Sequence, residues 1–252
     1  MPGEMKILVL VLAARAQPYP MLVRTIKRTW ASVPVDGVST LFYYGGDSLE
    51  LIGRDLHLPV TDELPAGRKT IACFEQVLRS QQFDAVFRTN CSSYIDLPNL
   101  RAFADDHARV EGFYCGPPGK FGDLPFASGA GYFLSKDLVE LVVDRQEEWD
   151  HSLPDDIALA GLLNRHGVVP VDAPRVDYTS ARQVHEVDTS QFMFRCKTES
   201  PWRVGDIRIM LALQQAFCRA RGGAYRSPLL TLTTALAHVY AAWLRIRRTV
   251  AP

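Results

Sequence analysis

The chain has 252 residues, of which 47% are hydrophobic and 22% charged, and its 28 Lys and Arg residues balance 28 Asp and Glu residues. This composition is typical of a globular protein with a sizeable core and excludes a disordered or fibrous chain. A formal net charge of zero argues against a nucleic-acid partner, because proteins that bind nucleic acids usually carry a basic excess. Five scattered cysteines without a Cys-x-x-Cys pair predict neither a disulfide framework nor a structural zinc site, and they favour a reducing compartment.

The first hundred residues alternate between predicted strands and predicted helices. Residues 6–14 are a continuous apolar run, typical of a strand buried on both faces; the run resembles a signal-peptide core but lacks a basic flank. The predicted elements are strands at 6–14, 38–44, 56–60 and 84–89, and helices at 21–30, 68–80 and 97–107. This alternation predicts an α/β fold with a mostly parallel sheet. Ligands bind beyond the carboxyl ends of such strands, so we expect residues 13–15, 44–47 and 89–93 to line one crevice.

The second half of the chain is less regular. Residues 172–201 are mostly polar and are predicted to be a loop, and residues 128–134 are mostly small. The predicted elements here are a strand at 112–115, a Gly- and Pro-rich loop at 116–125, helices at 136–149, 155–165 and 204–221, and a strand at 168–171. Ser135 is placed to cap the helix that follows it.

The C-terminal segment is apolar with a basic end. Residues 229–244 are almost free of charge and precede three arginines. A helix at 229–248 either packs on the domain or lies in the membrane interface with its arginines on anionic lipid. The segment is shorter than the roughly 20 apolar residues that span a membrane. We therefore expect a domain at 1–225 and a C-terminal helix within 226–252, in a cytoplasmic protein. With residues 229–248 in the membrane interface, the protein would lie peripherally on the inner membrane face.

Two polar segments follow buried or apolar runs and are candidates for chemistry. Residues 88–94 are either a simple turn after a strand or a set of donors aimed at a sugar or phosphate. Asp155 and Asp156 open a predicted helix. They either complement the helix dipole or supply a general base that accepts a proton from a hydroxyl.

A third candidate is a cluster of cations. Arg195, Lys197 and Arg203 either form a solvated face or neutralise a diphosphate, whose oxygens match the fork geometry of arginine. The six histidines show no metal-binding spacing. Among them His185 is the best candidate ligand, and we expect no metal centre.

Five short motifs occur in a recognisable order. They are Arg24-Thr25-Ile26-Lys27-Arg28-Thr29-Trp30, Lys69-Thr70, Arg88-Thr89-Asn90-Cys91-Ser92, Gly129-Ala130-Gly131-Tyr132-Phe133-Leu134-Ser135 and Asp155-Asp156-Ile157. In this order they resemble the inverting β-1,3-glycosyltransferases, the family that includes Fringe and the β-1,3-galactosyl- and N-acetylglucosaminyltransferases. The match runs from Lys6 to Val171. It implies a single Rossmann-like α/β domain of the A-type glycosyltransferase fold.

The resemblance also implies an activity. It is the transfer of a sugar from a nucleoside diphosphate, UDP by default, to a hydroxyl of a glycan or a lipid-linked acceptor, with inversion, as in polysaccharide biosynthesis. Asp156 matches the family's catalytic base. The expected substrate contacts are Asp155, Gly129, Ala130, Gly131, Asn90 and Ser92. The expected nucleotide or diphosphate contacts are Ala14, Arg15, Lys69, Thr89, Arg195, Lys197 and Arg203.

One departure from the family concerns the metal. The family binds manganese through an Asp-x-Asp motif, and this chain has Asn90, Cys91 and Ser92 there. Hard divalent cations prefer carboxylates, so Mn²⁺ is disfavoured and we expect no cofactor. The leaving diphosphate still needs positive charge. Some A-type enzymes supply it with Arg and Lys side chains near the C-terminus, and Arg195 and Lys197 are the candidates here.

Two other function classes differ in how well they fit the sequence. A non-catalytic relative that binds a sugar or nucleotide stays open, because the Asp-x-Asp pair is lost. A glycoside hydrolase is disfavoured, because its two carboxylates must flank the scissile bond at about 5–9 Å, and adjacent residues at one helix start do not easily do so.

Overall fold

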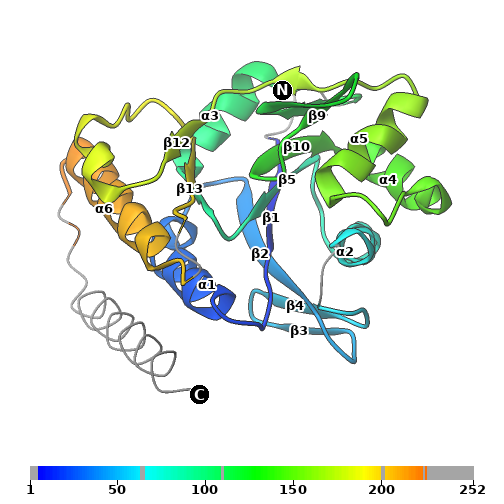
Figure 1. The fold of residues 1–252 in the computed structure, drawn as a ribbon, viewed down its shortest axis with the longest axis horizontal. Coiled ribbons are helices and arrows are strands. Elements are labelled where there is room, and N and C mark those ends of the chain that lie inside the picture. Colours follow the sequence, from blue (N-terminus) through cyan, green and yellow to red (C-terminus); the bar gives the residue numbers. More distant parts are fainter. Residues whose placement is uncertain (1–4, 63–65, 109–110, 200–201, 224, 226–252) are drawn as a thin grey trace, which may run out of the picture.

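A mostly parallel sheet forms the centre of the molecule. The computed structural model describes residues 5–62, 66–108, 111–199, 202–223 and 225. The strands of this sheet are β1 (Ile7–Leu12), β2 (Val38–Gly45), β3 (Glu50–Ile52), β4 (Asp55–Leu58), β5 (Ala85–Asn90), β7 (Tyr114–Gly116), β10 (Gly131–Ser135) and β11 (Val171–Asp172). Among the described residues their order is β11-β7-β10-β5-β1-β2-β4-β3 (Figure 1). Four of the seven pairings are parallel, which confirms the predicted fold class.

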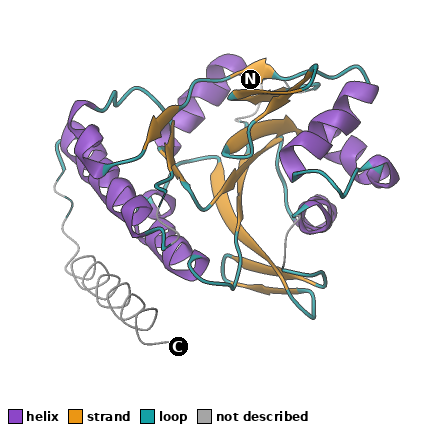
Figure 2. Ribbon diagram, viewed as in Figure 1, coloured by secondary structure: helices purple, strands orange, loops and turns teal. Residues whose placement is uncertain are grey.

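Helices cover both faces of the sheet (Figures 1 and 2). One face carries α1 (Tyr19–Arg28), α3 (Leu97–His107) and α6 (Val204–Ala220), and the other carries α2 (Gly67–Ser80), α4 (Lys136–Asp144) and α5 (Asp155–Arg165). Short 3-10 turns lie at η1 (Trp30–Ser32), η2 (Gln146–Glu148) and η3 (Ala181–Glu186). Side chains of β1 alternate between the two cores, with Val9 in one and Leu8 and Leu10 in the other. This alternation is why the N-terminal run is apolar throughout.

A second, small sheet lies where a loop was predicted. It consists of β12 (Val176–Tyr178), β13 (Met193–Cys196) and β6 (Ser93–Ile95), in the order β12-β13-β6. The prediction of a loop at 172–201 is therefore wrong, because such short strands have too few residues to show a period in the sequence. In this sheet Arg195 pairs with Ser93, so the sheet brings the cationic segment to the end of β5.

Other boundaries also differ from the predictions. A hairpin of β8 (Pro118–Phe121) and β9 (Leu124–Ala127) replaces the loop predicted at 116–125. The helix predicted at 136–149 ends at Asp144, because residues 144–147 are exposed and offer no apolar face to the core. Ser135 stands at the predicted cap position, but its hydroxyl accepts a hydrogen bond from the Phe113 amide (2.9 Å) and caps nothing.

Residues 226–252 lie outside the described residues, so the helix predicted at 229–248 and the boundary at residue 225 stay predictions. None of the described helices has the length and apolar character needed to cross a bilayer.

Candidate functional site

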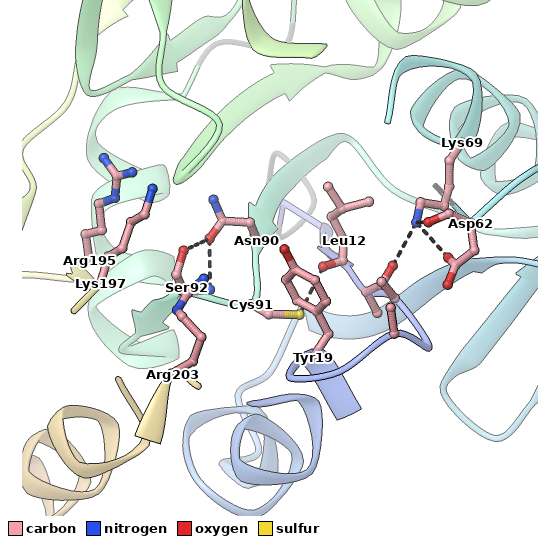
Figure 3. A pocket seen from close by; sticks show the side chains of 13 residues that line it. Leu12, Tyr19, Asp62, Lys69, Asn90, Cys91, Ser92, Arg195, Lys197 and Arg203 are labelled. Atoms are coloured by element: carbon pink, nitrogen blue, oxygen red, sulfur yellow. Dashed lines mark hydrogen bonds and ion pairs between the residues drawn. The ribbon is translucent and has the colours of Figure 1, made fainter. Parts of the chain in front are cut away.

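A cavity of about 510 Å³ opens at the carboxyl ends of β1 and β5. The β1–α1 segment lines it with residues that include Ala14 and Tyr19, and the end of β5 lines it with Asn90, Cys91 and Ser92. Figure 3 shows Arg195 and Lys197 at one end of this cavity and Lys69 with Asp62 at the other. The predicted crevice is thus formed by two of its three expected segments. Residues 44–47 line neighbouring hollows instead.

The floor of the cavity is uncharged. Cys91 is buried and its thiol donates a hydrogen bond to the carbonyl of Leu12 (3.0 Å). Burial raises the pKa of this thiol to about 12, so it stays protonated at neutral pH. Tyr19 and Leu12 complete an apolar side, which suits a planar or apolar part of a ligand.

Asn90 and Ser92, at the end of β5, form a hydrogen-bonded unit. Asn90 Oδ1 accepts bonds from the Ser92 amide (2.9 Å) and the Ser92 hydroxyl (2.6 Å), and Asn90 Nδ2 donates to the carbonyl of Gly129 (3.0 Å). The oxygen is neutral and already holds two donors, so this set does not fit Mn²⁺, which favours charged oxygen ligands.

No other metal cluster takes its place in the described part of the chain, where no three His, Cys, Asp or Glu side chains converge. His185 is exposed, with its ring nitrogens close to the Arg182 carbonyl and Glu186.

Arg195, Lys197 and Arg203 form a cationic wall of the cavity. Arg195 comes from β13, and Arg203 stands just before α6 in a left-handed backbone conformation (φ 54°). Two atoms of this wall, Arg195 Nε and Arg203 Nη2, are buried without a hydrogen-bond partner among the described residues. Leaving a donor of a charged group unpaired is unfavourable, so the wall is suited to an anionic ligand.

The fully buried carboxylate of Asp206 holds this wall in place. It accepts hydrogen bonds from the amide (2.7 Å) and hydroxyl (2.8 Å) of Thr198, and it pairs with Arg203 Nε. Gly205 leaves room for this arrangement, because a Cβ there would lie 2.5 Å from the Thr198 methyl group. Asp206 therefore joins Thr198, the neighbour of Lys197, to Arg203 without any ligand.

Lys69 lines the opposite end of the cavity, but its ammonium group is fully used inside the protein. Its Nζ donates to the Ala13 carbonyl (2.9 Å) and to Asp62 Oδ1 (2.8 Å), and the side chain is 2% exposed. Burial alone would raise the Asp62 pKa, but bonds from Lys69 and from the amides of Arg15 and Gly45 outweigh it and lower that pKa. Lys69 lines the cavity and has partners within the fold, and its predicted contact with a diphosphate stays a prediction.

Other predicted contacts are divided between the cavity and its surroundings. Ala14 lines the cavity, whereas Arg15 lines the adjoining hollow with its guanidinium beside His57 Nδ1 (3.1 Å). Thr89 is fully buried and its hydroxyl donates to the carbonyl of Ala130 (2.6 Å), so it does not face the cavity. Ala130 is buried as well.

The acidic pair stands at the first turn of α5, beside the turn that contains Gly129. Asp156 Oδ2 accepts a hydrogen bond from the Gly129 amide (2.7 Å), and the Gly129 carbonyl accepts one from Asn90. A single glycine therefore links Asp156 to the cavity rim, although Asp156 does not line the cavity itself. A Cβ at residue 129 would lie 3.0 Å from Arg88 Nη1 and 3.1 Å from Asp156 Oδ2, so a larger residue there would shift these side chains. Gly131 is also closely packed, because a Cβ on this residue would lie 2.6 Å from Met193 Sδ.

Some residues of the site were missed in the sequence. Asp155 pairs with Arg88, a buried arginine within β5, and Asp62 and Tyr19 line the cavity. The signal for Arg88 was available, because a charge inside the apolar strand run Ala85–Thr89 requires a buried partner. Nothing local marks Asp62, whose partner is set by the tertiary fold.

Comparison with known proteins bears on the fold. No protein-family model and no curated protein sequence matches the chain. Among solved structures it is similar to a glycosyltransferase involved in the glycosylation of the major capsid of PBCV-1, with 12% identity and a TM-score of 0.52, over 81% of this chain and 98% of that chain. The chain therefore has the Rossmann-like α/β fold found in a glycosyltransferase.

Proposed function

We propose that the protein is a nucleotide-sugar-dependent glycosyltransferase that works with inversion and without a metal ion. The donor is a nucleoside diphosphate sugar, with UDP as the expected nucleotide, and the acceptor is a hydroxyl of a glycan or lipid-linked saccharide. The fold is compatible with this activity, since the similar solved structure is described as a glycosyltransferase. The proposal depends on the site rather than on that likeness.

The observation that carries the proposal is the cationic wall. Arg195, Lys197 and Arg203 face one cavity at the carboxyl ends of parallel strands, and buried N–H groups of Arg195 and Arg203 have no partner among the described residues. A diphosphate in the cavity would lie beside these three cations, and its oxygens would accept hydrogen bonds from the groups that line the cavity. The same charges would stabilise it as it leaves, a role for which other enzymes use a metal ion. Asn90 and Ser92 would contact hydroxyls of the donor.

The chemistry is a direct displacement. Asp156 accepts the proton of the acceptor hydroxyl, whose oxygen attacks the anomeric carbon of the donor sugar. The bond from that carbon to the diphosphate oxygen breaks, and its electron pair leaves with the nucleoside diphosphate toward the cationic wall. Asn90, which lines the cavity, donates to the Gly129 carbonyl, and the Gly129 amide donates to Asp156, so the proposed base is joined to the cavity rim through one residue.

A panel of nucleotide sugars tests the activity. Release of nucleoside diphosphate is measured for each donor with a set of glycan acceptors, with and without EDTA. The proposal predicts release with at least one donor and an equal rate in EDTA. Loss of the activity in EDTA contradicts metal independence, and no release from any donor contradicts the transferase assignment.

An Asp156→Asn variant separates the enzyme from a non-catalytic binding protein. Losing the general base is expected to lower turnover by about 10²–10⁴-fold, while UDP binding in calorimetry stays unchanged because Asp156 lies outside the cavity. Asp123→Asn, which alters an exposed carboxylate, is the matched control. Normal turnover in Asp156→Asn would rule out the assignment of the base.

A further inference from the structure

Arg88 is a buried arginine in the middle of the central sheet. It belongs to β5, and 1% of the residue is exposed. An apolar residue would satisfy the packing of such a strand, because a buried charge is unfavourable unless it is paired and hydrogen-bonded. The presence of Arg88 therefore points to a task for its guanidinium group.

The guanidinium group of Arg88 bonds three different elements at once. Its Nε donates to the Tyr43 hydroxyl (3.1 Å), its Nη1 to the Gly129 carbonyl (2.8 Å), and its Nη2 pairs with Asp155. The Tyr132 ring lies over the group, 5.6 Å from Cζ to the ring centroid. Burial alone would lower the Arg88 pKa, but Asp155 and Tyr43 keep that pKa well above its usual value, so the charge is permanent.

Two of these partners, Asp155 and Gly129, are also direct neighbours of Asp156. Asp155 precedes Asp156 in the first turn of α5, and the Gly129 amide donates to Asp156 Oδ2 (2.7 Å). Around Gly129 the packing is close, since a Cβ on this residue would lie 3.0 Å from Arg88 Nη1 and 3.1 Å from Asp156 Oδ2. A shift of Asp155 or of Gly129, which both contact Arg88, therefore moves the Asp156 carboxylate.

We propose that Arg88 is a positioning residue for Asp156, which fixes the Gly129 turn and the start of α5 so that the base keeps one orientation. This inference rests on the proposed transferase function. It also assigns Asp155 to positioning rather than to substrate contact, because its carboxylate is 15% exposed and is held by Arg88 and by Thr70 Oγ1 (3.4 Å).

The test is a double-mutant cycle of Arg88→Gln with Asp156→Asn, measured as steady-state transfer in the full chain. Misplacing a catalytic group by about 1 Å costs about 100-fold in rate. We expect Arg88→Gln to lower kcat by about that factor while KM for the nucleotide sugar changes by less than about twofold. Arg88→Lys, which keeps the charge and one bond, should restore about tenfold of the loss. In the Asp156→Asn background, Arg88→Gln should cost less than about twofold, because the base is already gone.

A second variant covers the case in which Arg88→Gln fails to fold. Replacing both charges, in Arg88→Met with Asp155→Leu, removes the pair without leaving a buried charge, and we expect a folded protein with the same loss in kcat. Arg221→Gln is the matched control. It breaks the pair of Arg221 with the buried Asp96, and kcat per folded molecule should not change.

The outcomes separate the two proposals. If the wild-type protein transfers no sugar, the proposed function and this inference both fail. If the wild type is active and the paired replacement of Arg88 and Asp155 has wild-type kcat, only the positioning role is overturned. It is also overturned if Arg88→Gln lowers kcat by the same factor in the Asp156→Asn background as in the wild type.

Discussion

The cations at the two ends of the cavity differ in what their N–H groups contact. At the β2–α2 end, the ammonium of Lys69 is 2% exposed and bonds the Ala13 carbonyl and Asp62. At the β13–α6 end, buried N–H groups of Arg195 and Arg203 have no partner among the described residues. Each of these side chains carries the same formal charge of +1. The first cation is held by partners within the fold, and the second group is where we propose that the diphosphate binds.

This difference teaches how to separate structural cations from binding ones. Removing a buried cation whose donors are all used leaves its partners uncompensated, and moving it to a ligand would break the same bonds. A cation beside a cavity with an unpaired N–H group is energetically unfavourable, and a ligand that accepts a hydrogen bond from this group removes the cost. Mutations at the two ends should therefore separate stability from function.

The largest expected effect follows removal of the cationic wall. The double variant Arg195→Ala with Lys197→Ala should lower kcat/KM by about 10²–10³-fold, since one lost electrostatic donor costs about that much. The thermal midpoint should stay unchanged or rise slightly, because like charges are removed. Steady-state kinetics and calorimetric UDP titration measure the first effect, and scanning calorimetry measures the second.

Arg165→Ala, which breaks an exposed pair with Glu148, controls for loss of an arginine as such. Wild-type UDP affinity in the double variant would remove the difference between the two ends and contradict the proposed diphosphate site.

Lys69→Met should produce the opposite pattern. Removing one member of a buried pair leaves Asp62 uncompensated, and we expect the free energy of unfolding to fall by about 3 kcal/mol. The UDP affinity of the folded molecules should change less than in the wall variant. Urea unfolding and UDP titration are the measurements.

Lys27→Met is the comparison for Lys69. It breaks a pair with Asp55 in which both side chains are more than a quarter exposed, so a loss of only about 0–1 kcal/mol is expected. A UDP affinity that falls as steeply in Lys69→Met as in the wall variant would place Lys69 among the ligand contacts after all.

The sequence predicted the parts of the fold that repeat a pattern. The alternation of strands and helices identified the α/β class, and the continuous apolar run identified β1 with a core on each side. Asn90, Ser92 and Arg195, which the resemblance implied as ligand contacts, line one cavity. These features depend on periodicity and on the rule that parallel strands share their carboxyl ends.

The remaining features depend on contacts that no local pattern contains. The small sheet of β6, β12 and β13 is built from strands of three or four residues, too short to show alternation. The partner of Lys69 is set by where the fold places Asp62, so the sequence could not distinguish this lysine from the wall residues. The pairing of Asp155 with Arg88 spans 67 positions and is equally invisible to local reading.

The Asp62 carboxylate, the partner of Lys69, should make the stability of the folded protein depend on pH. Its pKa is lowered in the folded protein, so its contribution to stability is complete above the pKa of the unfolded chain and is lost as the pH falls through the folded pKa. Unfolding in urea between about pH 6 and pH 2 should show this loss. The fall of the unfolding free energy toward acid pH (the acid limb) should be shallower in Asp62→Asn and in Lys69→Met. An unchanged limb in both variants would mean that the Lys69–Asp62 pair adds nothing to stability.

The smallest expected effect concerns Lys197, the exposed member of the wall. An exposed charge acts through solvent, so Lys197→Ala should weaken UDP binding by about 0.2–1 kcal/mol. Salt shortens the range of this interaction, to about 3 Å at 1 M ionic strength, and the difference from wild type should vanish there. Arg195 is partly buried, so the loss in Arg195→Ala should persist in salt. Calorimetric UDP titrations across a NaCl series compare the two variants. Equal salt dependence would mean that both cations reach the ligand only through solvent, and the unpartnered Arg195 Nε would then have no part in binding.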